Sequence, residues 1–126
     1  TGLPPKNQID ANKWYMENID AFLGGYFYNT QAKNIFSNTV TSYSVSAHVG
    51  GAKNDISTMV RGLDIPTLIL VGEKNEHPLT TIDTAQKLNR LFLNSELQQI
   101  KNCGHFMFAE APIDFQNIVL NWIKQY

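Results

Sequence analysis

The chain has 126 residues, a formal net charge of −1 and 43% apolar residues, which suits one ordinary globular domain. No cluster of Lys and Arg occurs, so the composition excludes the basic surface of a nucleic-acid-binding protein. No apolar run reaches the roughly 18 residues of a membrane span, the first ten residues do not resemble a signal peptide, and the single Cys103 excludes an internal disulfide. We therefore expect a cytoplasmic protein with neither nucleic acid nor membrane as partner.

The first part of the chain carries apolar side chains at helical spacing. Ala11, Tyr15, Ile19 and Phe22 recur every three to four residues, and a pair of glycines at 24–25 weakens the pattern. One amphipathic helix is predicted. Its aromatic residues fit either simple core packing or the wall of an acyl pocket; they are Trp14, Tyr15, Phe22, Tyr26, Phe27 and Tyr28.

Residues 36–49 fit two different periodicities. The spacing of Phe36, Val40 and Ala47 favours a helix, whereas apolar and polar residues that alternate from 43 to 49 favour a half-buried strand. The sequence leaves both alternatives open. A short helical turn is expected at residues 55–61.

The second half of the chain predicts a strand, a helix, a strand and a helix. Residues 65–72 (IPTLILVG) form a continuous apolar run, so both faces of that strand are expected to be covered. Thr80-x-x-Asp83 resembles a capping box that opens the next helix, and a second strand is expected at 96–100. Pro112 stands in the first turn of the final amphipathic helix. This order is typical of parallel βαβ architecture.

Two strands are too few for a sheet that is buried on both faces. Sheets average roughly five to six strands, and a two-stranded parallel sheet leaves unpaired backbone groups along both edges. We therefore expect another polypeptide segment, the N-terminal half of the same gene product, to supply the remaining strands.

Two motifs of the second half resemble the C-terminal signature of the α/β-hydrolase superfamily. NCGHFMFAEAP (102–112) has the Gly-His pair, acidic residue and proline that precede the last helix of that fold. IPTLILVGEKNE (65–76) resembles the strand and turn that present the acid of the catalytic triad. The resemblance implies an α/β protein: residues 56–126 form the last two parallel strands of an α/β-hydrolase core with their helices, and residues 1–55 form a mainly helical cap or lid. Endings of this kind occur in proline iminopeptidases, esterases and carbon–carbon hydrolases.

The resemblance makes His105 the catalytic histidine. In a parallel sheet the loops after the strands converge on one edge, so the acid and the histidine meet there. His105 would serve as general base and then as general acid. A lone Gly-His pair is more often a loop histidine without a role, but the strand, proline and amphipathic helix around it favour catalysis. The nucleophilic serine is expected in the N-terminal half, because no G-x-S-x-G occurs in this chain.

The acid position holds asparagine. The aspartate of the superfamily aligns with Asn75, which can orient an imidazole but cannot stabilise its cationic form as a carboxylate does. Three alternatives stay open: Glu76 takes the role, Asn75 is a weakened triad member, or an acid from the missing half substitutes. Glu73 is an outside candidate.

The resemblance therefore implies a serine hydrolase that cleaves an ester, amide or related bond in a small molecule or peptide. Its partner would be the N-terminal half of the fold, which supplies the nucleophile and most of the oxyanion hole. No cofactor and no metal are expected, since His48 and His77 lack partners at metal-ligand spacing. The alternative is a non-catalytic α/β-hydrolase-like binding protein, which Asn75 motivates.

Overall fold

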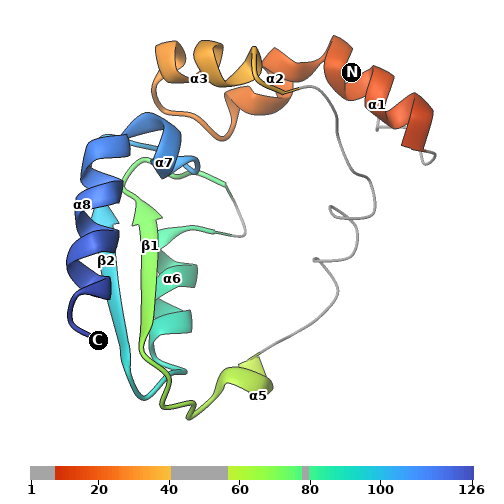
Figure 1. Cartoon of the computed structure of the whole chain (residues 1–126). Coiled ribbons are helices and arrows are strands. Elements are labelled where there is room, and N and C mark those ends of the chain that lie inside the picture. Colours follow the sequence, from red (N-terminus) through yellow and green to blue (C-terminus); the bar gives the residue numbers. More distant parts are fainter. Residues whose placement is uncertain (1–7, 41–56, 78–79) are drawn as a thin grey trace.

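The structure, a computed structural model, describes residues 8–40, 57–77 and 80–126. Both strands point toward the end of the sheet over which the first three helices lie (Figure 1). The strands are β1 (Thr67–Gly72) and β2 (Ser95–Ile100). The helices are α1 (Gln8–Glu17), α2 (Ile19–Gly24), α3 (Thr30–Ser37), α5 (Ser57–Val60), α6 (Ile82–Asn89), α7 (Met107–Glu110) and α8 (Pro112–Ile123).

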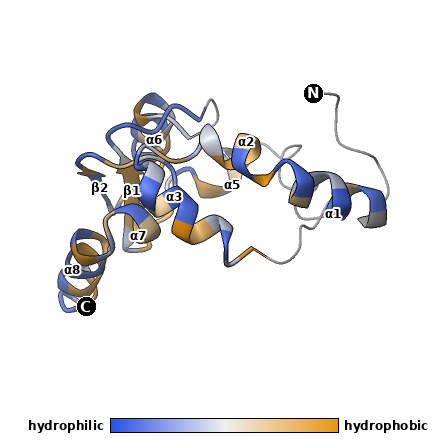
Figure 2. Ribbon diagram, turned by 90° about the horizontal axis from the view of Figure 1, so that it is seen from above, coloured by the Kyte–Doolittle hydropathy of each residue, from blue (hydrophilic) through white to orange (hydrophobic). Residues whose placement is uncertain are grey.

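β1 and β2 are parallel neighbours, with Thr67 opposite Ser95 and Gly72 opposite Ile100. α6 connects them, and α6 and α8 lie on opposite sides of the two strands (Figures 1 and 2). Ile69 and Val71 of β1 are buried against Ala85 of α6. This confirms the predicted strand, helix, strand, helix order, including the final helix that begins at Pro112.

The start of α6 differs from the prediction by one residue. The N-cap is Thr81, whose hydroxyl accepts a hydrogen bond from the backbone N–H of Thr84, so the predicted capping box at Thr80 and Asp83 is wrong. The hydroxyl of Thr80 is used elsewhere, because it faces Asn75 and His105.

The predicted first helix is two helices. α1 ends at Glu17 and α2 begins at Ile19, and Asn18 between them has a φ of −117° and a ψ of 17°, outside helical values. Its side-chain amide donates to the carbonyl of Trp14 at 2.8 Å, beside the backbone bond to the same carbonyl at 3.1 Å. The buried residues of the predicted stripe, Ala11 and Tyr15, nevertheless lie on one side of α1.

The segment with two possible periodicities is described only in part. Phe36 lies in α3, whereas residues 41–56 fall outside the described residues, so the choice between helix and strand there is untested. The helical turn expected at 55–61 is confirmed by α5.

The C-terminal helix has an uncovered apolar surface. No residue of α8 is buried, and the exposed fractions of Ile113 and Ile123 are 72% and 54%. Figure 2 shows hydrophobic residues along α8 and in both strands. Within the described ranges the sheet has two strands, so the chain forms part of a larger fold. In the same ranges, no helix has the length and apolar character needed to cross a membrane.

Candidate active site

His105 lies in the loop that leaves the carboxyl end of β2. The loop opens with Asn102 at a φ of +54° and then buries Cys103 completely. The backbone N–H of His105 donates to the carbonyl of Tyr26 at 2.7 Å. The histidine is therefore held between the end of the sheet and the segment after α2.

Two glycines allow this loop to come so close to its neighbours. A Cβ on Gly72, the last residue of β1, would overlap the carbonyl oxygen of Gly104 and lie 2.5 Å from that of Cys103. A Cβ on Gly104 would lie 2.5 Å from the carbonyl oxygen of Tyr26. These are backbone atoms that cannot give way, so glycine is required at both positions.

The carboxylate of Glu110 joins the histidine loop to the first helices. Its Oε1 accepts from the backbone N–H of Gly104 at 2.8 Å. Its Oε2 accepts from the backbone N–H groups of Tyr28 and Asn29 at 2.8 and 2.7 Å. Asn29 is in turn the N-cap of α3 and accepts from Gln31. One side chain thus fixes both sides of the site, which is why an acidic residue stands five positions after His105.

The ring of His105 is half-buried among aromatic rings. Its centroid lies 5.3 Å from that of Tyr26, 5.1 Å from that of Phe106 and 5.2 Å from that of His77. Burial, with a smaller contribution from His77, lowers the pKa of His105 below its ordinary value of 6.5. Both effects favour the neutral imidazole, which is the form that a general base requires.

The loop after β1 brings Asn75 near His105 without a direct bond. The Nδ2 of Asn75 donates to the carbonyl and hydroxyl oxygens of Thr80 at 2.7 and 3.1 Å, and its Oδ1 accepts from the backbone N–H of His77 at 3.1 Å. Among the described residues, the atom bonded to the Nδ1 of His105 is the hydroxyl of Thr80, at 3.0 Å.

The two glutamates of this loop lie apart from His105. Glu76 is exposed, and no hydrogen bond joins it to His105 in the described part of the chain. The Oε2 of Glu73 accepts from the backbone N–H of Asn102 at 3.1 Å. That bond, with the charge of Lys74, lowers the pKa of Glu73. Glu73 therefore serves to tie the two loops together, and the triad roles considered for Asn75 and Glu76 stay predictions.

The contact of Thr80 with His105 cannot be predicted from the sequence. Thr80-x-x-Asp83 predicts a helix cap, and no sequence pattern distinguishes a capping hydroxyl from one that faces a histidine. Its proximity to His105 depends on how the loop after β1 folds back, which becomes visible only in the structure.

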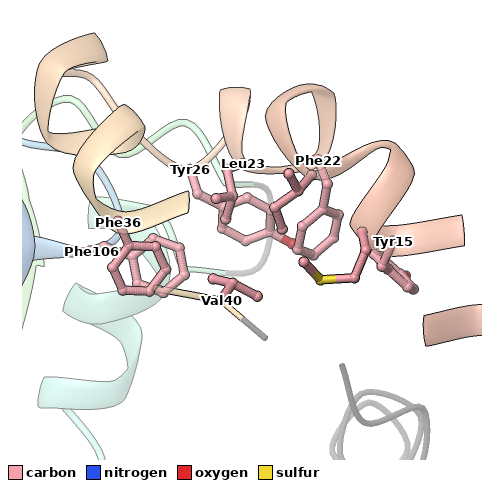
Figure 3. A pocket seen from close by; sticks show the side chains of 9 residues that line it. Tyr15, Phe22, Leu23, Tyr26, Phe36, Val40 and Phe106 are labelled. Atoms are coloured by element: carbon pink, nitrogen blue, oxygen red, sulfur yellow. The ribbon is translucent and has the colours of Figure 1, made fainter. Parts of the chain in front are cut away.

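An apolar cavity of about 260 Å³ adjoins the histidine. Figure 3 shows Phe36 and Phe106 at one end of the cavity and Phe22 and Tyr15 at the other. Tyr26 and Phe106 belong both to the cavity wall and to the ring cluster around His105. Three of the six aromatic residues considered for an acyl pocket line the cavity: Tyr15, Phe22 and Tyr26.

Cys103 is buried in the histidine loop. Its side chain is fully enclosed, and burial together with the charge of Glu110 raises the pKa of the thiol to about 11. Because the thiolate is the nucleophilic form, burial and the raised pKa disfavour this cysteine as a nucleophile at neutral pH.

Comparison with known proteins shows which fold the chain resembles. No family model and no curated protein matches the chain. Among solved structures, it is similar to MenH from S. aureus, with 28% identity and a TM-score of 0.52 over 57% of this chain and 26% of the other. It is also similar to CarC, a serine hydrolase involved in carbazole degradation, with 25% identity and a TM-score of 0.55 over 77% of this chain and 34% of the other.

The esterase EaEST from Exiguobacterium antarcticum matches a larger share of this chain, with a higher TM-score. The TM-score is 0.74 at 18% identity, over 89% of this chain and 44% of the esterase. The chain thus spans less than half the length of each of these three structures.

The fold is that of part of an α/β hydrolase. The chain matches only part of each structure, which is consistent with a fragment of that superfamily, and its structural neighbours include a serine hydrolase and an esterase.

Proposed function

We propose that this chain is the histidine-bearing part of a serine hydrolase that cleaves esters, amides or related bonds. The observation that carries the proposal is the position of His105 at the carboxyl end of β2, beside an apolar cavity. Its low pKa and partial burial suit a group that takes a proton from a serine hydroxyl and returns it to the leaving group.

The serine and the remaining strands belong, in this proposal, to the N-terminal part of the same fold. The uncovered apolar residues of α8 support it, as do the edges of the sheet, which have no further strand within the described residues. Residues 1–55 are proposed as a cap and residues 56–126 as core. The hydrogen bonds between Glu110 and the backbone of Tyr28 and Asn29 then attach the cap to the core.

The cavity favours a substrate with one apolar acyl or aryl group. Its volume suits a single such group, and its lining is aromatic and aliphatic. We expect 4-nitrophenyl hexanoate to be hydrolysed with a higher kcat/KM than the acetate. Val40→Phe, which fills the cavity, should remove that preference, whereas Val60→Phe in α5 should keep it.

The decisive experiment uses the complete protein, with all strands of its fold. A fluorophosphonate probe should label the wild type, and His105→Ala should abolish labelling and ester turnover while it changes stability by less than about 1 kcal/mol. Lys101→Ala, an exposed residue of the same loop, is the matched control and should retain activity. Full activity in His105→Ala would remove His105 from the mechanism.

One observation favours a second function, a non-catalytic binding protein of this fold. The side-chain amide of Asn75 is hydrogen-bonded to Thr80 and to the backbone of His77. In the described residues no carboxylate is hydrogen-bonded to His105. If no variant is labelled by the probe, while apolar esters or their acids raise the melting temperature of the folded protein, this second function replaces the first.

A further inference from the structure

The polar groups behind His105 form a network that involves a second histidine. The hydroxyl of Thr80 lies 3.0 Å from the Nδ1 of His105 and 3.3 Å from the Nδ1 of His77. We propose that Thr80 and His77 are positioning residues for His105: the hydroxyl couples the tautomers of the two rings, so that His105 can accept a proton at Nε2 only while His77 is neutral. The catalytic consequence rests on the proposed function, whereas the coupling itself does not.

The direction of the network is set at Asn75. Its Nδ2 donates to the backbone carbonyl of Thr80, which can only accept, and its Oδ1 accepts from the backbone N–H of His77, which can only donate. These two bonds fix the orientation of the amide without reference to any side chain. The second N–H of the amide then donates to the Thr80 hydroxyl oxygen.

The hydroxyl therefore has little freedom left. A threonine hydroxyl carries one proton and two acceptor lone pairs. Asn75 occupies one lone pair, which leaves one lone pair and one proton for two imidazole nitrogens. One ring must donate its Nδ1–H to Thr80 while the other accepts the hydroxyl proton at a bare Nδ1, so the two neutral rings are forced into opposite tautomers.

Only one of the two arrangements suits a general base. When His105 donates from Nδ1, its Nε2 is free to accept a proton, and the Nδ1 of His77 is bare. When His77 takes up a proton, its Nδ1–H must donate to Thr80. The hydroxyl proton then turns to the Nδ1 of His105, whose own proton moves to Nε2 and blocks the base. The proton count is the same throughout except for the one that His77 takes from solvent.

Among the titratable groups around the two rings, His77 is the one that acts on the protonation of His105. The segment after α2 contributes the phenol of Tyr26, whose ring lies 4.8 Å from that of His77 and whose pKa is raised by burial. The histidine loop contributes Cys103, buried with a raised pKa, and Glu110, whose carboxylate binds backbone N–H groups. The loop after β1 contributes the exposed Glu76. In the described residues, His77 is the charge that acts on the pKa of His105.

The test reads the tautomer directly in the complete protein labelled with ¹⁵N-histidine. Long-range ¹H–¹⁵N correlations at about pH 8, where ordinary histidines are neutral, should show opposite tautomers of His105 and His77 in the wild type, with Nδ1–H at His105 if the proposed function holds. His77→Phe keeps the ring but removes the acceptor for the hydroxyl proton. The His105 tautomer should then change to Nε2–H.

The coupling must pass through the hydroxyl. In a Thr80→Val background, His77→Phe should leave the His105 tautomer unchanged, and in a Thr80→Ser background it should change it again. Thr84→Val is the matched control, because that hydroxyl lies in α6 and is bonded to Thr81 rather than to either histidine. A His105 tautomer that ignores His77→Phe, or that responds equally in the Thr80→Val background, overturns the proposal.

Activity gives a separate measurement. If the complete protein is a hydrolase, His77→Phe should lower kcat by about 100-fold or more with little change in KM, as for loss of a correctly held base. If the tautomers are coupled but no variant hydrolyses esters, the proposed function fails and the coupling stands. If the enzyme is active but the tautomers are not coupled, the coupling fails and the proposed function stands.

Discussion

The two loops at the end of the sheet are built in different ways. The loop after β2, which carries His105, is held by backbone contacts: Gly72 and Gly104 permit close approach, and Glu110 binds three backbone N–H groups. The loop after β1 is held by side chains, chiefly Asn75 and Thr80. The position of the histidine is therefore a property of the chain path, whereas its partner is a property of individual side chains and is open to substitution.

The largest effect on turnover should come from a substitution in the loop after β1. In Asn75→Asp, the oxygen that replaces Nδ2 cannot donate to the Thr80 carbonyl, so the side chain must turn away from that carbonyl. The carboxylate can then accept the hydroxyl proton of Thr80, which turns a Thr80 lone pair toward His105 and holds the Nδ1–H tautomer. The negative charge also stabilises the imidazolium. We expect turnover by the complete protein to rise by about 100-fold or more, as measured with activated esters.

Glu76→Gln is the control for that result and should change turnover little. If instead Glu76→Gln costs orders of magnitude and Asn75→Asp adds nothing, Glu76 already serves as the acid. If neither matters while a serine probe still labels the protein, the acid lies in another part of the fold.

The close contact between Gly72 and the loop after β2 should make any side chain at position 72 destabilising. A Cβ there meets the carbonyl oxygens of Gly104 and Cys103, so Gly72→Ala should lower the free energy of unfolding by about 2–3 kcal/mol. Gly24→Ala in α2 meets nothing within 4 Å and should be neutral or slightly stabilising. Urea unfolding measures both, and equal stability of the two variants would contradict the close approach.

A smaller loss is expected from Glu110→Gln. The amide retains one of the two acceptor oxygens, so one or two bonds to the N–H groups of Gly104, Tyr28 and Asn29 are lost, at a cost of about 1–2 kcal/mol. Amide exchange at those three positions should accelerate. Glu17→Gln, which removes only the exposed ion pair with Lys13, should change neither measurement.

The smallest effect concerns pH. The pKa of folded His105 is lower than in the unfolded chain, so between the lowered value and about 6.5 the unfolded state binds more protons. The free energy of unfolding should therefore fall as the pH drops through that window, and this contribution should be constant above it. His105→Gln should flatten that part of the profile. A His105 resonance that titrates at or above 6.5 would contradict the burial described here.

The same difference explains what the sequence could predict. Both strands, the order of elements and the place of His105 follow from hydrophobic patterns and from a Gly-His-Pro spacing, because these determine the chain path. The bond from the Asn18 amide to Trp14 and the bond between Thr80 and His105 do not, since each is one of several hydrogen bonds that the side chain can form. Asn75 falls between: its place in the loop after β1 follows from the strand pattern, but the direction in which its amide turns does not.

The rate at which Cys103 is modified can measure how fast the histidine loop opens. The chain has one thiol, it is fully enclosed two residues from His105, and its pKa is about 11. A thiol reagent can therefore modify it only when the loop opens. At reagent concentrations where modification becomes independent of the reagent, the labelling rate is the opening rate, so ordinary chemistry in a test tube would time a movement at the centre of the candidate active site.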